Sequence, residues 1–238
     1  MALPLTGIFG GTFNPVHVGH VRAAIEVAEA LGLGAVEFVP AARPPHKCGG
    51  PLLDFALRLR LCRLAVAGIP GFSVNAMEAE RPGPSYTCET LAALAGARPG
   101  EDFCFIMGMG DLLHLGQWKE GFGLGRRAHL AVHAREGLGL VAFTAFLVAN
   151  GPAMDAAPTS DPAVWSLPGD RRLTFVPIAR LDVSASDIRE RWRQQKRIHG
   201  LVSEAVLREL KNHADALEAG WGRPESDAIP GMPSCKAT

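Results

Sequence analysis

Short apolar runs alternate with helical patterns along most of the chain. Between the first two runs, apolar residues recur at helical spacing over residues 21–31, and Gly32 supplies a stop signal. Strands that alternate with helices indicate right-handed crossovers and a parallel sheet covered on both faces. The pattern therefore predicts a doubly wound α/β fold, which binds ligands beyond the carboxyl ends of its strands. The runs expected to form strands are Leu5–Phe9, Ala35–Pro40, Phe72–Met77, Asp102–Gly108, Ala128–Ala134 and Leu173–Ile178.

The most apolar segment covers residues 138–151, and its alanines leave helix and strand both open. This segment is too short to span a bilayer, so we interpret it as core packing. The N-terminus lacks the basic start and the long apolar core of a signal peptide. The five cysteines form no C-x-x-C pair and are interpreted as thiols in a reducing cytosol. These features predict a cytoplasmic protein with no membrane partner.

Length and charge limit the function classes. The 238 residues are enough for one large domain or two small ones, with a substantial core. Lys plus Arg equals Asp plus Glu, at 24 each, so no net charge attracts nucleic acid or anionic lipid. We therefore expect no nucleic-acid partner, and any anion site must be local.

The stretch GIFGGTFNPVHVGH, at residues 7–20, ends the first expected strand and begins the first expected helix. Gly10 and Gly11 leave the backbone open to a phosphate, and the helix adds its positive N-terminal end. His17 and His20 are three residues apart and can point side by side at one anion. The spacing fits neither of the common glycine-rich nucleotide motifs. The stretch predicts a phosphate site with two imidazole donors; a tight turn followed by helix-capping histidines is the alternative.

A second phosphate anchor is predicted at VSASDIRERW, residues 183–192. Ser184 or Ser186 can cap a short helix whose N-terminal amides face an anion, and Arg189 adds a charged fork one turn later. Taken alone, the segment is better explained as a capped amphipathic surface helix. Its pairing with the N-terminal stretch favours the phosphate site.

Residues 10–20, GGTFNPVHVGH, match the pattern G-G-[ST]-F-[DN]-P-x-H-x-G-H throughout. The chain thereby resembles the nucleotidyltransferases with an H-x-G-H signature, and among them the bacterial nicotinate-nucleotide adenylyltransferases. Similar segments follow in the same order at PPHK, ERPGPSYTCETL, FIMGMGDLLHLGQW and VSASDIRERW. The resemblance covers about residues 5–212 and implies a Rossmann-like fold.

The resemblance implies a reaction between ATP and nicotinate mononucleotide that yields nicotinate adenine dinucleotide and pyrophosphate. Mg²⁺ is expected to arrive with ATP, because phosphate oxygens and water supply most of its ligands. His17, His20 and Arg189 are expected to act on the reacting phosphates, and residues 183–192 to hold the β- and γ-phosphates. The residues matched to ATP binding are Gly10, Gly11, Thr12, Phe13, His17, His20, Ser184, Ser186, Ile188 and Arg189.

The same resemblance places the nicotinate mononucleotide. Backbone amides near Tyr86 and Thr87 are candidates for binding the nicotinate, and Trp118 for stacking on its ring. Without the resemblance, these segments are explained as a turn into a capped helix and a half-buried core aromatic. The residues matched to this substrate are Asn14, Lys47, Tyr86, Thr87, Gly108, Asp111 and Trp118.

One segment departs from the family. The pattern G-x-D is replaced by Gly108-Met109-Gly110, with Asp111 one position later. Either Asp111 reaches a ribose hydroxyl from a shifted helix start, or that contact is lost. His129 and His133 lie in an expected strand and are interpreted as structural, so no dedicated metal site is expected.

Three alternatives stay open at this point. Another member of the superfamily, such as a pantetheine-phosphate adenylyltransferase, shares the first and last motifs. An RNA-binding protein with a related H-x-G-H is disfavoured by the balanced charge. A nucleotide-binding regulator without activity is kept open by the shifted aspartate. The preference between acid and amide substrates and the oligomeric state, including a homo-oligomer, are not determined.

The domain organisation follows from the motifs and the C-terminal composition. We expect one nucleotidyltransferase domain over residues 1–215, with a small C-terminal helical segment at about 184–215. Glycine, proline and small polar residues predict a disordered tail over residues 216–238.

Overall fold

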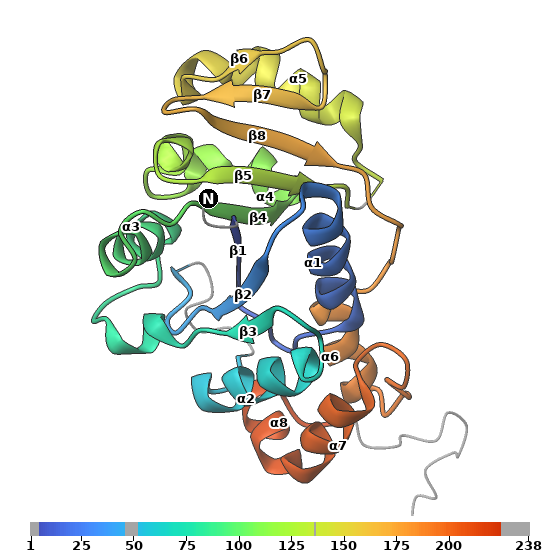
Figure 1. Cartoon of the computed structure of the whole chain (residues 1–238). Helices are drawn as coiled ribbons and strands as arrows, with labels where there is room; N and C mark the ends of the chain where they lie inside the picture. The colour runs from blue at the N-terminus through green and yellow to red at the C-terminus, as the bar shows by residue number, and fades with distance from the viewer. Residues whose placement is uncertain (1–4, 46–51, 136, 225–238) are drawn as a thin grey trace, which may run out of the picture.

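The computed structural model describes residues 5–45, 52–135 and 137–224 (Figure 1). A single sheet runs through this part of the chain in the order β3-β2-β1-β4-β5-β8-β7-β6. The pairs from β3 to β8 are parallel, and β7 and β6 add an antiparallel edge. The strands are β1 (Thr6–Gly11), β2 (Ala35–Pro40), β3 (Phe72–Val74), β4 (Phe103–Gly108), β5 (His129–His133), β6 (Ala157–Pro158), β7 (Val164–Leu167) and β8 (Arg171–Val176).

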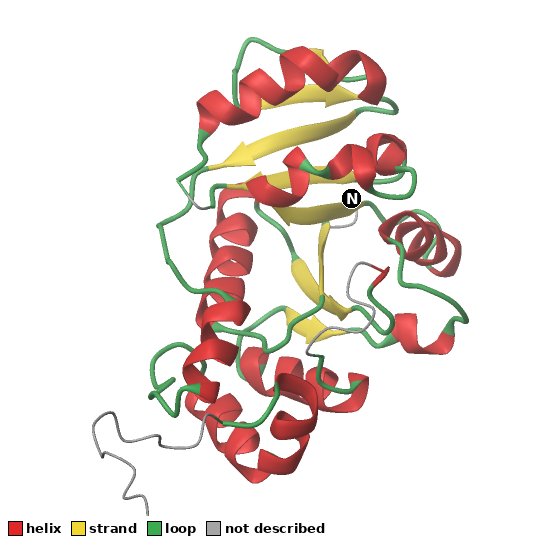
Figure 2. Cartoon of the chain, turned by 180° about the vertical axis from the view of Figure 1, so that it is seen from behind, coloured by secondary structure: helices red, strands yellow, loops and turns green. Residues whose placement is uncertain are grey.

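Helices cover both faces of the sheet (Figures 1 and 2). One hydrophobic cluster packs α1, α2 and α6 to α8 against it, and a second cluster packs α3, α4 and α5 against the opposite face. The helices are α1 (Val18–Leu31), α2 (Phe55–Val66), α3 (Thr87–Ala97), α4 (Met109–Leu113), α5 (Leu140–Asn150), α6 (Ala185–Arg193), α7 (Glu204–Asn212) and α8 (Ala214–Trp221). Short 3-10 helices lie at Met77–Glu80, Leu115–Gln117, Gly121–Arg126 and Gly151–Met154. The doubly wound, Rossmann-like fold is thus confirmed.

The order of the strands places the ligand site. β1 lies between β2 and β4, so successive crossovers leave it in opposite directions. The carboxyl ends of β1 and β4 therefore border a crevice at the point where the strand order reverses, which is where open α/β sheets bind ligands. The glycine-rich stretch follows β1, as the sequence predicted.

Some elements differ from expectation. The strand expected at Phe72–Met77 ends at Val74, and Met77 begins a 3-10 helix. The apolar segment left open between helix and strand is helix α5. The antiparallel strands β6 and β7 were not predicted, because they are short and their register is set by β8 rather than by local periodicity.

The folded chain continues past residue 215, where the composition predicted a disordered tail over residues 216–238. Helix α8 covers Ala214–Trp221, and its Leu217 and Trp221 are buried in the hydrophobic core. The expected boundary is wrong over these residues because Leu217 and Trp221, one turn apart, bury their side chains in the core and outweigh the nearby Gly220. Residues 225–238 lie outside the described part.

Candidate functional site

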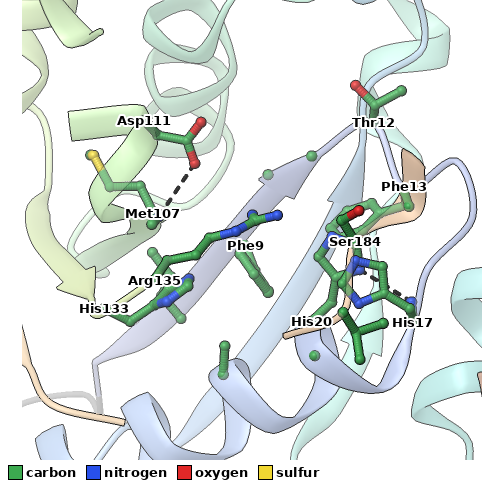
Figure 3. Close-up of a pocket in the computed structure, with 18 of the residues that line it drawn as sticks. Phe9, Thr12, Phe13, His17, His20, Met107, Asp111, His133, Arg135 and Ser184 are labelled. Carbon is green, nitrogen blue, oxygen red and sulfur yellow. Dashed lines mark hydrogen bonds between the residues drawn. The ribbon is translucent and has the colours of Figure 1, made fainter. Parts of the chain in front are cut away.

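A cavity of about 620 Å³ opens at the carboxyl ends of β1, β4 and β5 (Figure 3). It is lined by the loop after β1, the first turn of α1, the start of α3, the start of α4 and the segment that leads into α6. This volume is in the usual range of small-molecule sites. The cavity therefore gathers segments from both ends of the described chain.

A buried arginine of α2 stabilises the loop after β1. Arg58 of α2 is 1% exposed and donates from Nη1 to the carbonyl of Thr12 at 2.8 Å and from Nε to that of Leu53 at 3.0 Å. The next residue, Phe13, has a φ of 48°. This conformation costs free energy and persists only where the surrounding structure imposes it. The hydrogen bond to Thr12 and the burial of the Phe13 ring impose it here.

Asn14 ties this loop to the C-terminal helix. Its side-chain oxygen accepts from the backbone N–H of Leu53 at 3.1 Å and from the indole Nε1 of Trp221 at 3.0 Å. Its backbone carbonyl accepts from Nη1 of Arg189 at 2.8 Å. Asn14 is 2% exposed, so its polar atoms form their hydrogen bonds within the protein. Although Asn14 lines the cavity, its side chain therefore positions the loop.

Replacing Trp221 by phenylalanine tests this connection. The change removes one hydrogen bond to the buried Asn14 oxygen, and we expect the free energy of unfolding to fall by about 1 kcal/mol. Urea denaturation measures the difference. Trp192→Phe is the matched control, because Trp192 packs edge-to-face on Trp221 with ring centroids 5.7 Å apart. Equal losses in the two variants would argue against the bond to Asn14.

His17 and His20 stack side by side at the start of α1. Their ring centroids are 3.6 Å apart with 28° between the planes, and Nδ1 of His20 accepts from the backbone N–H of His17 at 3.1 Å. Between them, a Cβ on Gly19 would lie 3.0 Å from Nδ1 of His17, so only glycine fits without a shift. The predicted side-by-side arrangement of the two imidazoles is therefore present.

The ring nitrogens of His17 are buried, and neither has a hydrogen-bond partner among the described residues. Burial lowers the pKa of His17 to about 3, with a smaller contribution from the charge of Arg135. The imidazole is thus neutral at physiological pH and keeps one N–H for an acceptor. An unsatisfied buried donor beside a cavity is expected where a ligand completes the hydrogen bond.

The lowered pKa of His17 predicts a loss of stability in acid. Between pH 6.5 and about 3 the unfolded chain binds a proton at this residue that the folded chain does not, so stability falls as pH falls. From pH 7 to pH 5 this contribution is about 2 kcal/mol. Urea denaturation at both pH values should show that His17→Gln loses less stability than the native chain. The other histidines are common to both proteins and cancel; equal losses would contradict the prediction.

Helix α6 brings the second predicted anchor to the same cavity. Ser184 caps the helix, because its Oγ accepts from the N–H of Asp187 at 3.0 Å. Nη2 of Arg189 donates to Oγ of Ser186 at 2.9 Å, and burial lowers the pKa of this arginine without neutralising it. Ser184, Ser186 and Arg189 all line the cavity. Ile188 does not: it is fully buried in the core below α6, so its side chain anchors the helix.

The residues matched to the second substrate lie along another wall. Tyr86, Thr87 and Trp118 line the cavity where α3 begins. Nζ of Lys119 lies 4.8 Å from the centroid of the Tyr86 ring and 2.7 Å from Oε1 of Glu89. These contacts place a cation beside the first turn of a helix. Lys47 lies outside the described residues.

Asp111 reaches the cavity despite its shifted position. Helix α4 begins at Met109, directly after β4, and Oδ2 of Asp111 accepts from the N–H of Gly108 at 3.3 Å. Both residues line the cavity. The sequence left open whether Asp111 reaches the ligand site or the contact is lost. In the structure its carboxylate turns back toward the end of β4.

His133 and Arg135 are among the lining residues that the sequence analysis missed. His133 ends β5, and Arg135 follows it; both line the cavity. The interpretation of both histidines as structural stays a prediction, but their places differ: His133 lines the cavity, whereas His129, at the other end of β5, accepts from the N–H of Arg172 and does not line it. Figure 3 shows His133, Arg135 and Asp111 on one side and His17, His20 and Ser184 on the other. The signal was available, since His133 falls at the carboxyl end of an expected strand.

The described part of the chain contains neither a clustered metal site nor a membrane-spanning helix. No three side chains of His, Cys, Asp or Glu come close enough to hold a metal ion there. Within the same ranges, no helix combines the length and the apolar character that crossing a bilayer requires.

The comparisons with known proteins point to one family. Residues 8–191 match the family model described as Cytidylyltransferase-like. A protein of Geotalea uraniireducens is 37% identical over 213 residues, which cover 86% of this chain and 94% of the relative. A protein of Geobacter sulfurreducens is 39% identical over 211 residues, which cover 85% and 94%. Both carry the name "Probable nicotinate-nucleotide adenylyltransferase".

Solved structures share the fold. The Plasmodium falciparum nicotinic acid mononucleotide adenylyltransferase complexed with NaAD superposes with a TM-score of 0.67 at 14% identity and covers 90% of this chain and 97% of its own. The same enzyme complexed with APC gives a TM-score of 0.66 at 13% identity, with the same coverage. At these identities the likeness is one of architecture.

Proposed function

Because the chain belongs to the cytidylyltransferase-like family, and within it to the nicotinate-nucleotide adenylyltransferases, we propose that its cavity binds ATP and nicotinate mononucleotide across the end of β1. The activity is transfer of the adenylyl group of ATP to nicotinate mononucleotide in NAD biosynthesis. The products are nicotinate adenine dinucleotide and pyrophosphate. The proposal assigns the residues of the cavity to this reaction.

In the reaction, a phosphate oxygen of nicotinate mononucleotide attacks the α-phosphorus of ATP. The bond from the α-phosphorus to the bridging oxygen breaks, and pyrophosphate leaves with that oxygen. No covalent intermediate with the protein is needed, so catalysis consists of alignment and stabilisation of charge on the phosphoryl oxygens. We assign His17 and His20 to those oxygens as hydrogen-bond donors, and Arg189 to the phosphates that leave.

One observation supports this assignment most strongly. Arg189 lies 175 positions from Asn14 in the chain, yet it donates a hydrogen bond to the loop that precedes the two histidines. The His17–His20 pair and Arg189 thus border one cavity. A single triphosphate can contact both, and one of its oxygens would accept the N–H of the neutral His17 ring. Gly10, Gly11, Thr12 and Phe13 complete this wall.

We assign the nicotinate to the wall formed by the start of α3. The first backbone amides of a helix, here near Tyr86 and Thr87, favour a carboxylate. Lys119, which pairs with Glu89, lies beside them, and Trp118 offers a ring for stacking. This chemistry favours the acid over the uncharged amide of the same mononucleotide. Gly108 and Asp111 are assigned to a ribose.

We assign Mg²⁺ to the nucleotide rather than to a protein site. The donors that line the cavity suit phosphate oxygens, and a divalent ion bound to ATP would keep most of its ligands from phosphate and water. Chelation should therefore abolish turnover without unfolding the chain. We also propose that the enzyme works in the cytoplasm, in keeping with the free buried thiols of Cys62, Cys88 and Cys104.

The function is tested by pyrophosphate release from ATP with three acceptors. Nicotinate mononucleotide should be the best acceptor, nicotinamide mononucleotide a weaker one, and phosphopantetheine inactive. Equal rates with the acid and the amide would contradict the assignment of the nicotinate to α3 and Lys119. Release with phosphopantetheine alone would replace the proposed function by that of a pantetheine-phosphate adenylyltransferase.

A further inference from the structure

His133 presents an unused hydrogen-bond acceptor to the cavity. It is the last residue of β5, pairs in register with Gly108 of β4, and is 5% exposed. Its ring lies edge-to-face with Phe9 at a centroid distance of 6.3 Å, and Phe9 meets His20 in the same way at 6.2 Å. His133 and His20 thus lie within one small molecule's length of each other.

The hydrogen bond on the inner side of the ring determines which nitrogen carries the proton. Nδ1 lies 3.1 Å from the carbonyl oxygen of Ala134, which can only accept, so Nδ1 carries hydrogen. Burial lowers the pKa of His133, which keeps the ring neutral. Nε2 therefore carries a lone pair, and it has no hydrogen-bond partner among the described residues. A Cβ on Gly108 would lie 3.6 Å from this Nε2, so the nitrogen faces the end of β4.

A second acceptor lies beside it. Asp111 is exposed, and its Oδ2 accepts from the N–H of Gly108. This carboxylate and Nε2 of His133 therefore border the same glycine. Arg135 is the nearby donor, and in Figure 3 its guanidinium extends away from His133 and Asp111 toward the middle of the cavity. Two acceptors at one strand end offer no hydrogen to a phosphate or a carboxylate. They favour a ligand that brings two hydroxyl donors close together.

We propose that His133 Nε2 and the Asp111 carboxylate bind the two adjacent hydroxyl groups of a ribose, and that His133 selects ribonucleotides over deoxyribonucleotides. This inference rests on the proposed function, which supplies two riboses: that of ATP and that of nicotinate mononucleotide. The shared chemistry is a vicinal diol. His133 receives one hydroxyl hydrogen and Asp111 the other.

The test compares ribonucleotides with analogues that lack one hydroxyl. Rates are measured with 2′-deoxy-ATP and 3′-deoxy-ATP, and with the 2′-deoxy and 3′-deoxy forms of nicotinate mononucleotide. The native enzyme should use at least one analogue about 10- to 100-fold less well in kcat/KM, and the affected substrate identifies the ribose. His133→Phe keeps a flat ring but removes the acceptor. It should lower kcat/KM for the ribonucleotide about tenfold, leave the analogue nearly unchanged and so remove the discrimination.

Control variants separate recognition from packing. His129→Phe changes a histidine of the same strand outside the cavity and should keep the native discrimination. His133→Gln restores an acceptor and should recover part of it. If His133→Phe does not fold, Asp111→Asn serves with the same analogues and should reduce the discrimination at the other hydroxyl.

Two results would overturn the inference: use of all four analogues by the native enzyme as readily as the ribonucleotides, or an equal fall for ribose and deoxyribose substrates in His133→Phe. Both are distinct from failure of the proposed function, in which ATP and nicotinate mononucleotide release no pyrophosphate at all. Calorimetric binding of ATP and the two deoxy-ATP analogues gives the same comparison without turnover.

Discussion

His20→Ala should lower kcat by about a hundredfold or more, with a smaller change in KM for ATP. The imidazole of His20 lies at the start of α1 against His17 and lines the cavity that we assign to the triphosphate. A donor that strengthens its bond as charge develops on the phosphoryl oxygens contributes to the transition state more than to the ground state. Removing one such donor commonly costs two to three orders of magnitude in rate, as a rough guide. Steady-state release of pyrophosphate measures it.

The matched control for this prediction is His114→Ala. His114 directly follows α4 and is exposed. Among the described residues its side chain hydrogen-bonds only the carbonyl of Gly110, and it does not line the cavity. This variant should keep native kcat. If His20→Ala retained more than about a fifth of the native kcat, the role of the His17–His20 pair in the proposed reaction would be lost.

Arg189→Ala should lower kcat/KM for ATP about a hundredfold. Its guanidinium holds Oγ of Ser186 and the carbonyl of Asn14, so it orders the α6 turn and the loop after β1 while keeping its charge at the cavity. A charge-assisted fork of this kind contributes up to about 3 kcal/mol, which corresponds to the expected factor. Arg189→Lys should recover only part of the loss, since lysine retains the charge and lacks the fork.

Arg191→Ala is the control on the same helix. Arg191 donates to the carbonyl of Arg197 and does not line the cavity. Similar losses of kcat/KM in the two alanine variants would indicate that α6 acts through its folding alone. A native-like Arg191→Ala beside a defective Arg189→Ala would support direct binding of the ATP phosphates.

Several parts of the site were predictable because their signals are local. The stretch from Gly10 to His20 carries its glycines, its helix start and both imidazoles within one short segment, and the structure brings the glycines and both imidazoles to the cavity. Ser184, Ser186 and Arg189 were found in the same way, from a capping pattern. Ile188 shows the limit of transferring a motif whole: its side chain packs into the core although its neighbours line the cavity.

Other parts required distances that no local pattern carries. The role of Asp111 depended on how far α4 turns back to Gly108, and that of His133 on which strand lies beside β4. Asn14 was expected to meet the substrate, yet its side chain bonds Leu53 and Trp221. Trp221 lies in a stretch whose composition predicted disorder, and its burial became visible only with the core that covers it.

The sequence by itself determined the alternation of strands and helices, the phosphate-binding character of the first loop and the family, because each is written in periodicity or in residues a few positions apart. Only the tertiary structure decided that Arg189 and the two histidines share one cavity, and that His133 and Asp111 both border Gly108 at the end of β4. The hydrogen bond from Arg189 to the loop before the histidines joins residues 175 positions apart. The geometry of these contacts follows from strand order and from helix packing, which depend on the whole core at once.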